Sequence, residues 1–119
     1  MAINSDFRGR VAEAAVEALR IVKPGATVGG CAKASAATDK IIGTSDELDH
    51  VTGEMVDIAV GLVPKVRLGG TVAAGDALTS DANGKAIATT TTGNRIIGYA
   101  EVAGVADDVI TYLRALGTI

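Results

Sequence analysis

Alternation of apolar and polar residues predicts β-strands through the middle and at the end of the chain. Residues 58–62 and 66–68 place an apolar side chain at every second position, which puts these side chains on one face of a strand. Pro64 lies between the two segments and cannot donate a backbone hydrogen bond, so we expect an edge or a bulge there. Residues 109–116 alternate less regularly, which indicates a strand buried on both faces.

The first part of the chain gives a mixed signal. Residues 11–20 have good helix propensity, with apolar residues spaced by three and four. The same stretch runs into Lys23-Pro24-Gly25, a turn signal that equally suits the end of a first strand. We expect a strand over residues 15–22 and an irregular segment over residues 1–10. In terms of domains, residues 1–14 are expected to form an N-terminal arm, and residues 15–119 a single β-domain.

An internal repeat is the most informative feature of the sequence. Residues 29–43 (GGCAKASAATDKIIG) and 84–98 (GKAIATTTTGNRIIG) align without gaps. Both copies end in a basic residue followed by Ile-Ile-Gly, which low-complexity Ala/Thr sequence does not readily imitate. The sequence therefore predicts an all-β fold, a small barrel or sandwich built from two similar β-units. We expect Ile41-Ile42 and Ile96-Ile97 to occupy equivalent positions, with at least one Ile of each pair buried.

Composition narrows the possible partners. The chain has 119 residues, 48% of them hydrophobic but only 3% aromatic, so its core is expected to consist of Val, Ile, Leu and Ala. The net charge is −3 and the basic residues are scattered. Binding of phosphates needs clustered Lys and Arg, so we expect no nucleic-acid partner. No apolar stretch is long enough to span a bilayer, and we expect no membrane partner.

The residue types needed for catalysis or metal binding are scarce. The sequence has one histidine, His50, and one cysteine, Cys31. A nucleophilic Cys–His pair is formally possible, but a surface histidine and a small buried thiol are the simpler interpretation. Asp46, Glu47 and Asp49 lack the spacing of a calcium loop and are expected to form a solvated acidic loop. We therefore expect no catalytic residues, no metal and no cofactor.

One lysine leaves an alternative open. The turn-rich segment 67–78 resembles the pattern of barrel-sandwich carrier domains, such as lipoyl or biotinyl modules, which are also built from two similar halves. Lys85 follows the strong turn signal Asn83-Gly84, where such domains carry their modified lysine. The hydrophobic or acidic neighbours typical of that lysine are missing here.

The N-terminal segment contains the candidate partner-binding residues. Ile3, Phe7, Arg8 and Arg10 lie in the expected arm, and Phe7 is the single Phe of the chain. Aromatic residues and Arg are the types that most often anchor protein interfaces. We expect these four side chains to contact a partner protein or a neighbouring subunit.

Several short motifs, in a fixed order, resemble the capsid cement or decoration proteins of tailed bacteriophages, a family long described as a domain of unknown function. The motifs in question are Gly75-Asp76, Leu78-Thr79-Ser80-Asp81, Gly84-Lys85-Ala86 and Ile96-Ile97-Gly98-Tyr99-Ala100-Glu101, with Arg20-Ile-Val-Lys23 and 36–43 upstream. The resemblance covers roughly residues 18–116. It implies a non-enzymatic virion protein, made in the host cytoplasm, that binds the major capsid protein on the outer surface of the shell and stabilises it. By analogy it also implies a homo-oligomer, a trimer.

Overall fold

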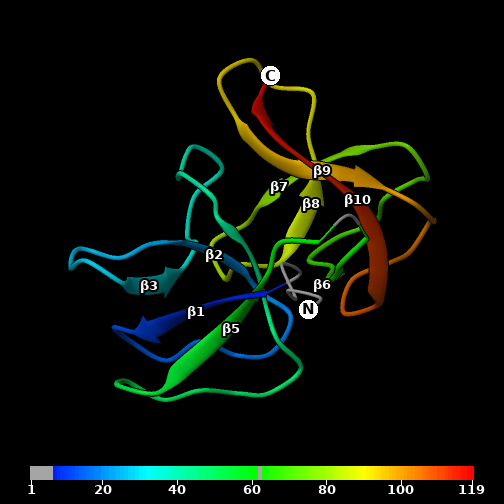
Figure 1. Ribbon diagram of the computed structural model, residues 1–119. Coiled ribbons are helices and arrows are strands. Elements are labelled where there is room, and N and C mark those ends of the chain that lie inside the picture. Colours follow the sequence, from blue (N-terminus) through cyan, green and yellow to red (C-terminus); the bar gives the residue numbers. More distant parts are fainter. Residues whose placement is uncertain (1–6, 62) are drawn as a thin grey trace, which may run out of the picture.

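The part of the chain that the structure describes contains ten β-strands and no helix (Figure 1). The computed structural model describes residues 7–61 and 63–119, with the backbone alone for Phe7 and Arg8. The strands are β1 (Phe7–Ala12), β2 (Ile21–Pro24), β3 (Gly30–Lys33), β4 (Gly43–Ser45), β5 (Met55–Ala59), β6 (Lys65–Arg67), β7 (Ala77–Ser80), β8 (Ala86–Ala88), β9 (Arg95–Ala100) and β10 (Val109–Thr118). The all-β prediction is thus confirmed.

The first five strands close into a barrel, the first unit. Their order is β1-β3-β2-β4-β5, and β1 completes the ring because it pairs in parallel with β3 and antiparallel with β5. The other neighbours are antiparallel. Short strands suit such a small barrel, because tight turns can connect neighbours and no sheet edge remains open.

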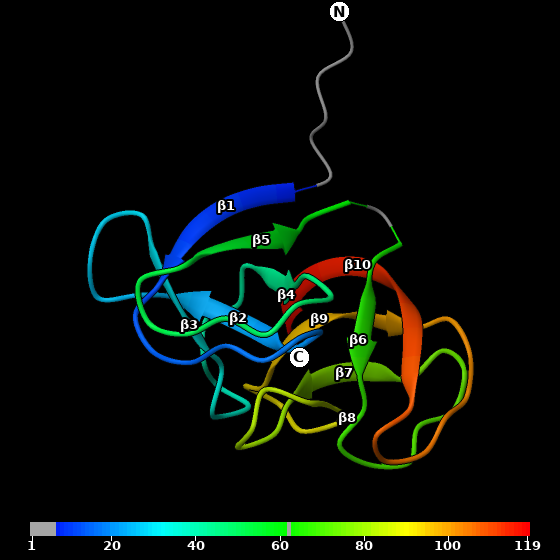
Figure 2. The same ribbon diagram turned by 90° about the horizontal axis from the view of Figure 1, so that it is seen from below.

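The last five strands, the second unit, repeat this arrangement. Their order is β6-β10-β9-β7-β8, the same circular order as in the first unit. A single parallel bridge between Leu68, next to β6, and Ala86 of β8 joins the two ends of the sheet. This bridge is equivalent to the pair Ala12–Cys31, through which β1 and β3 pair in the first unit. Figure 2 shows the two units side by side, with β1 and β5 on one side and β6, β7 and β10 on the other.

The two units also share one strand register. The antiparallel bridge between Val16 and His50 recurs as that between Val72 and Gly104, at offsets of 56 and 54 residues. The pair Ile21–Thr44 recurs as Ala77–Tyr99, at offsets of 56 and 55 residues. Equivalent residues therefore lie 56 apart in β1 and β2, 55 apart in β3 and β4, and 54 apart in β5. The repeat seen in the sequence coincides with the middle of each unit, where the offset is 55.

The cores confirm the duplication. Every buried residue of the first core has an equivalent in the second core at these offsets: Ala12 and Leu68, Val16 and Val72, Val22 and Leu78, Cys31 and Ala86, Val56 and Ile110, Ile58 and Tyr112. The second core is bulkier because Leu68 and Tyr112 replace smaller residues. Ile96 and Ile97 are buried, whereas Ile41 and Ile42 are only partly buried. The expectation of one buried Ile in each pair is therefore met in the second copy only.

The glycine that ends each Ile-Ile-Gly motif has a steric explanation. A Cβ atom added to Gly43 would collide with the carbonyl oxygen of Ala59 on the neighbouring strand. A Cβ added to Gly98 would collide with the carbonyl oxygen of Leu113, the equivalent residue of the second unit. Both positions therefore need a residue without a side chain, because two backbones approach closely there.

The two units are tied together through the second core. Ile21 and Ala34, both from the first unit, are fully buried within that core. The Arg114 guanidinium donates a hydrogen bond of 2.8 Å from β10 to the carbonyl oxygen of Ile42. Since side chains of the first unit complete the interior of the second, the second core is not built from its own unit alone.

Two expectations for the N-terminal part need correction. Residues 15–20 are not a strand: the extended segment begins at Ile21, and only Val16 makes an isolated bridge. Leu19 has a φ of 58°, which interrupts both helix and strand, and its N–H donates to the carbonyl of Asp46. Residues 7–10 are not irregular, because they belong to β1 and pair with β5. Neither outcome follows from local propensity, since distant segments supply the hydrogen bonds.

Candidate interaction surface

Of the four candidate partner-binding residues, three lie in β1. Ile3 lies outside the described residues. Phe7 and Arg8 pair through their backbones with Ala59 and Ile58 of β5. The Arg10 guanidinium donates to the carbonyl oxygen of Gly30 at 3.4 Å, so this side chain lies along the barrel.

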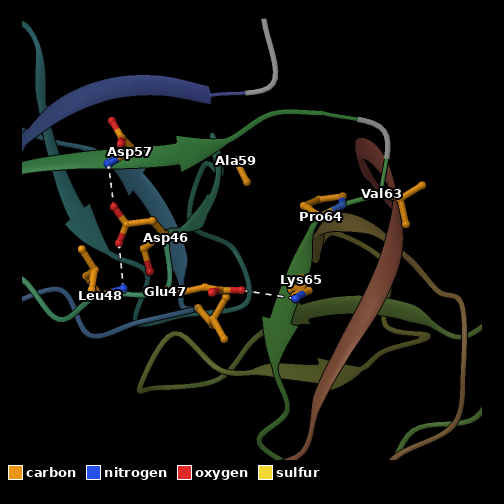
Figure 3. Close-up of a pocket in the computed structure, with 10 residues that line it drawn as sticks. Asp46, Glu47, Leu48, Asp57, Ala59, Val63, Pro64 and Lys65 are labelled. Atoms are coloured by element: carbon orange, nitrogen blue, oxygen red, sulfur yellow. Dashed lines mark hydrogen bonds and ion pairs between the residues drawn. The ribbon is translucent and has the colours of Figure 1, made fainter. Parts of the chain in front are cut away.

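A groove of about 560 Å³ lies beside the start of β1, at the junction of the two units (Figure 3). The first unit supplies one wall through Leu19, residues 45–48, Asp57 and Ala59, and the second unit supplies the other through residues 63–65. Ala59 lines the groove and is also the register partner of Phe7. The N-terminal end of β1 and the groove therefore belong to one face of the molecule.

Apolar side chains are exposed at this groove. Leu48 is 66% exposed and Val63 is 48% exposed. Pro64 lies beside Val63 and is itself buried. Large apolar residues that converge from two segments at one hollow are a common feature of protein-binding surfaces.

The carboxylates around the groove are largely bonded within the molecule. The Glu47 carboxylate pairs with the Lys65 ammonium at 3.2 Å, across the groove. The Asp46 carboxylate accepts from the N–H groups of Leu48 and Asp57 at 3.0 and 3.2 Å (Figure 3). Asp49 caps the Ala18 N–H at 2.8 Å. These acids fix the shape of the loop, which sequence reasoning assigned only as solvated.

The histidine and the cysteine do not form a nucleophilic pair suited to catalysis. Cys31 is fully buried in the first core, and this burial raises the pKa of its thiol, which keeps it protonated near neutral pH. The His50 side chain is only 10% exposed, which corrects the expectation of a surface histidine. Its Nε2 lies 2.9 Å from an Asp46 carboxylate oxygen, so the ring braces the acidic loop.

Metal ligation finds no support in the part of the chain that the structure describes. Within residues 7–61 and 63–119, no group of three or more His, Cys, Asp or Glu side chains is placed to hold a metal ion. Nor does any helix suited to crossing a membrane occur among those residues.

Lys85 is held in place by an ion pair. Its ammonium lies 2.7 Å from the Asp107 carboxylate, and its side chain is 24% exposed. This ion pair lowers the pKa of the Asp107 carboxyl. The preceding turn forms as its sequence predicts: the Asp81 carboxylate accepts from the N–H groups of Asn83 and Lys85, and Gly84 has a φ of 73°. A lysine that awaits modification usually projects freely, and Lys85 does not.

Sequence reasoning missed the groove because its lining residues come from several separate segments, which extend from Leu19 to Lys65. One local signal was available, since Leu48 is an apolar residue inside the acidic stretch Asp46-Glu47-Leu48-Asp49. No pattern indicated that residues 63–65 would stand opposite this stretch.

Comparison with known proteins finds a likeness in fold. No protein-family model matches the chain, and no curated protein matches it significantly. Among solved structures, the chain is similar to the N base of the head fiber gp8.5 of bacteriophage phi29, with a TM-score of 0.72 and 18% sequence identity. The match covers 95% of this chain and 96% of the other. The protein therefore has the fold of a bacteriophage head fiber base over nearly its whole length.

Proposed function

We propose that the protein is a structural component of a tailed-bacteriophage virion that binds the outer surface of the capsid and stabilises the shell. The observation that carries this proposal is the fold shared with a phage head fiber base over 95% of the chain. The ordered motifs that resemble capsid cement proteins lead to the same class independently of that likeness. Fold alone does not define function, so the chemistry of the surface has to agree with it.

The chemistry of the surface is that of a binding protein. Exposed apolar residues gather at the groove, whereas the histidine and the cysteine are occupied in structural roles. A protein on the outside of a shell also has no need for a basic surface, in contrast to one that faces packaged DNA. A non-catalytic role is consistent with each of these features.

We assign capsid attachment to the face formed by the groove and the N-terminal end of the chain. Leu48 and Val63 contribute exposed apolar surface, and the neighbouring start of β1 carries Phe7 and Arg8. Ile3 and Arg10 complete the set of residues that we assign to contacts with the major capsid protein or a neighbouring copy. The free protein is expected to associate with itself, as a trimer by analogy with decoration proteins.

Co-sedimentation of the purified chain with heads assembled from the capsid protein of the same phage tests this assignment. We expect Leu48→Asp and Val63→Asp to reduce occupancy strongly, because each places a charge in an apolar contact. Phe7→Ala is expected to cost about 1–3 kcal/mol of binding. Val105→Asp, at another exposed apolar position, serves as the matched control and should bind normally.

Removal of residues 1–6 tests the N-terminal end separately. The deletion leaves β1 complete, so the melting temperature should change little while occupancy on heads falls. Unchanged occupancy with all of these variants would contradict the assigned face, and failure of the wild-type chain to bind heads would contradict the proposed function.

The carrier-domain alternative makes a different prediction. A lipoyl or biotinyl group on Lys85 would break its ion pair with Asp107 and add a defined mass. We expect the intact mass of the protein from its native source to show no such adduct.

A further inference from the structure

The two units have similar structures, but each uses a different face at the junction between them. The first unit contributes the segment 19–21: the carbonyl oxygen of Leu19 accepts from the Arg67 N–H at 2.9 Å, and the Ile21 N–H donates to the carbonyl oxygen of Gly84 at 2.7 Å. A Cβ added to Gly84 would lie 2.6 Å from the Lys33 side chain, so this turn sits directly on the first unit. The contact is therefore head-to-tail. Because the units are similar, each one also has a face equivalent to the face that the other unit uses at the junction.

The counterpart face on the second unit is open. Leu19, Ile21, Lys33 and Thr44 correspond to Gly75, Ala77, Ala88 and Tyr99 at the offsets of the shared register. These four residues line a hollow of about 670 Å³, together with Thr89, Thr90 and Ile119 among others. On the first unit, this face is covered by the second unit. The equivalent face of the second unit is exposed and forms the hollow.

The counterpart face on the first unit is apolar and exposed. Arg67 and Asn83, which touch the first unit, correspond to Val11 and Val28. Val28 is 106% exposed and Val11 is 41% exposed. Met55, the register partner of Val11, is 58% exposed. The Val11 N–H donates to the carbonyl oxygen of Gly29, which brings these residues together at one seam of the barrel.

The turn that carries Val28 is held firmly. The Glu13 carboxylate accepts three hydrogen bonds from it: from the Ala26 N–H at 2.9 Å, the Thr27 N–H at 2.9 Å and the Thr27 hydroxyl at 2.6 Å. An apolar side chain presented on a rigid turn loses little conformational entropy on binding. Figure 1 shows this turn between β2 and β3, at a distance from the C-terminal end of β10.

We propose that two copies of this chain associate head-to-tail, with the Val11–Val28–Met55 patch of one copy seated in the hollow at Ala77, Ala88 and Tyr99 of the next. The contact repeats the junction between the units of one chain. The contact between copies differs from that junction in one respect. The Val11 N–H and the Gly29 carbonyl oxygen bond to each other within the first unit, so they are not available to a neighbouring copy. Contacts between apolar side chains therefore replace the backbone hydrogen bonds of the junction. Contacts of this kind close into a ring or extend into a fibre.

The inference deepens the self-association stated above and rests on it, but it does not depend on attachment to a capsid. Disulfide trapping tests it directly. Val28→Cys and Thr90→Cys are made as separate single variants, mixed and oxidised. We expect a disulfide between the two variants on mixing and little dimer from either alone, because the contact joins unlike faces. The native Cys31 is buried and does not compete.

Val105→Cys mixed with Val28→Cys is the control for random collisions, since Val105 is 55% exposed and lies outside the hollow. A trapping yield no higher than in this control would overturn the proposal, and so would preferential Val28–Val28 disulfides, which indicate a symmetric contact.

Sedimentation velocity supplies the second measurement. Val28→Asp should weaken association by about tenfold or more, whereas Val105→Asp should leave it unchanged. Equal association of both variants would contradict the proposed contact. Binding of Val28→Asp to heads is measured in parallel, so that loss of self-association and loss of capsid attachment are told apart.

Discussion

The Tyr112 hydroxyl lies 3.2 Å from the Thr44 hydroxyl, in a fully buried contact between the second core and β4 of the first unit. Tyr112 occupies the position that Ile58 has in the first unit. The larger side chain reaches beyond its own core, and Thr44 satisfies its polar end. This pair is a buried polar contact that links the two units.

Replacement of Tyr112 by Phe should destabilise the protein by about 1–2 kcal/mol, because it leaves the Thr44 hydroxyl buried with one partner fewer. Chemical denaturation measures the difference in the free energy of unfolding. Tyr99→Phe is the matched control, since the Tyr99 side chain is exposed, and it should have little effect. Equal effects of the two replacements would show that the hydroxyl contact contributes nothing.

Alkaline pH should destabilise the protein through the same residue. Burial raises the pKa of Tyr112 from 10.0 to about 12. The unfolded chain therefore loses this proton at lower pH than the folded chain does, so stability is full below pH 10 and falls as the pH rises through 12. Two pKa units correspond to about 2–3 kcal/mol. Denaturation midpoints measured across this range should fall more steeply for the wild type than for Tyr112→Phe, and parallel curves would contradict the assignment.

Gly43→Ala and Gly98→Ala should each destabilise the protein by roughly 2–3 kcal/mol, because the added methyl group forces two strands apart. Gly93→Ala is a suitable comparison: Gly93, like Gly98, has a positive φ, 94°, but a Cβ there meets no atom within 4 Å. Its cost should be limited to backbone strain, about 1 kcal/mol. Thermal melts of the three variants distinguish steric collision from strain alone.

His50→Ala and Cys31→Ala should leave the binding of the protein to phage heads intact. His50→Ala removes the brace on Asp46, and Cys31→Ala leaves a small cavity in the first core, so both are expected to lower the melting temperature modestly. Co-sedimentation with heads, at a temperature where both variants are folded, is the measurement. Loss of binding by folded Cys31→Ala would reveal a site that the present assignment lacks, whereas loss by folded His50→Ala alone would show that the brace on Asp46 sets the shape of the groove.

The all-β fold and its two-unit construction were already determined by the sequence. Alternation of apolar residues has the period of a strand and is a local property, and the turn at Asn83-Gly84 needs only its own residues. The Ile-Ile-Gly repeat was visible because close backbone approach admits glycine alone, at Gly43 and at Gly98. Such steric demands leave a mark in a single sequence.

The tertiary structure alone decided how these pieces combine. Residues 7–12 became the closing strand of a barrel because β5, some fifty residues away, supplies their partners. Residues 15–20 became a turn with Leu19 at positive φ because their backbone bonds to residues 45, 46 and 50 and, across the junction, to Arg67. The groove beside Leu48 and the hollow beneath Tyr99 likewise depend on contacts between distant segments. Pairing between remote residues carries no local periodicity, so these features emerge only when the chain is folded.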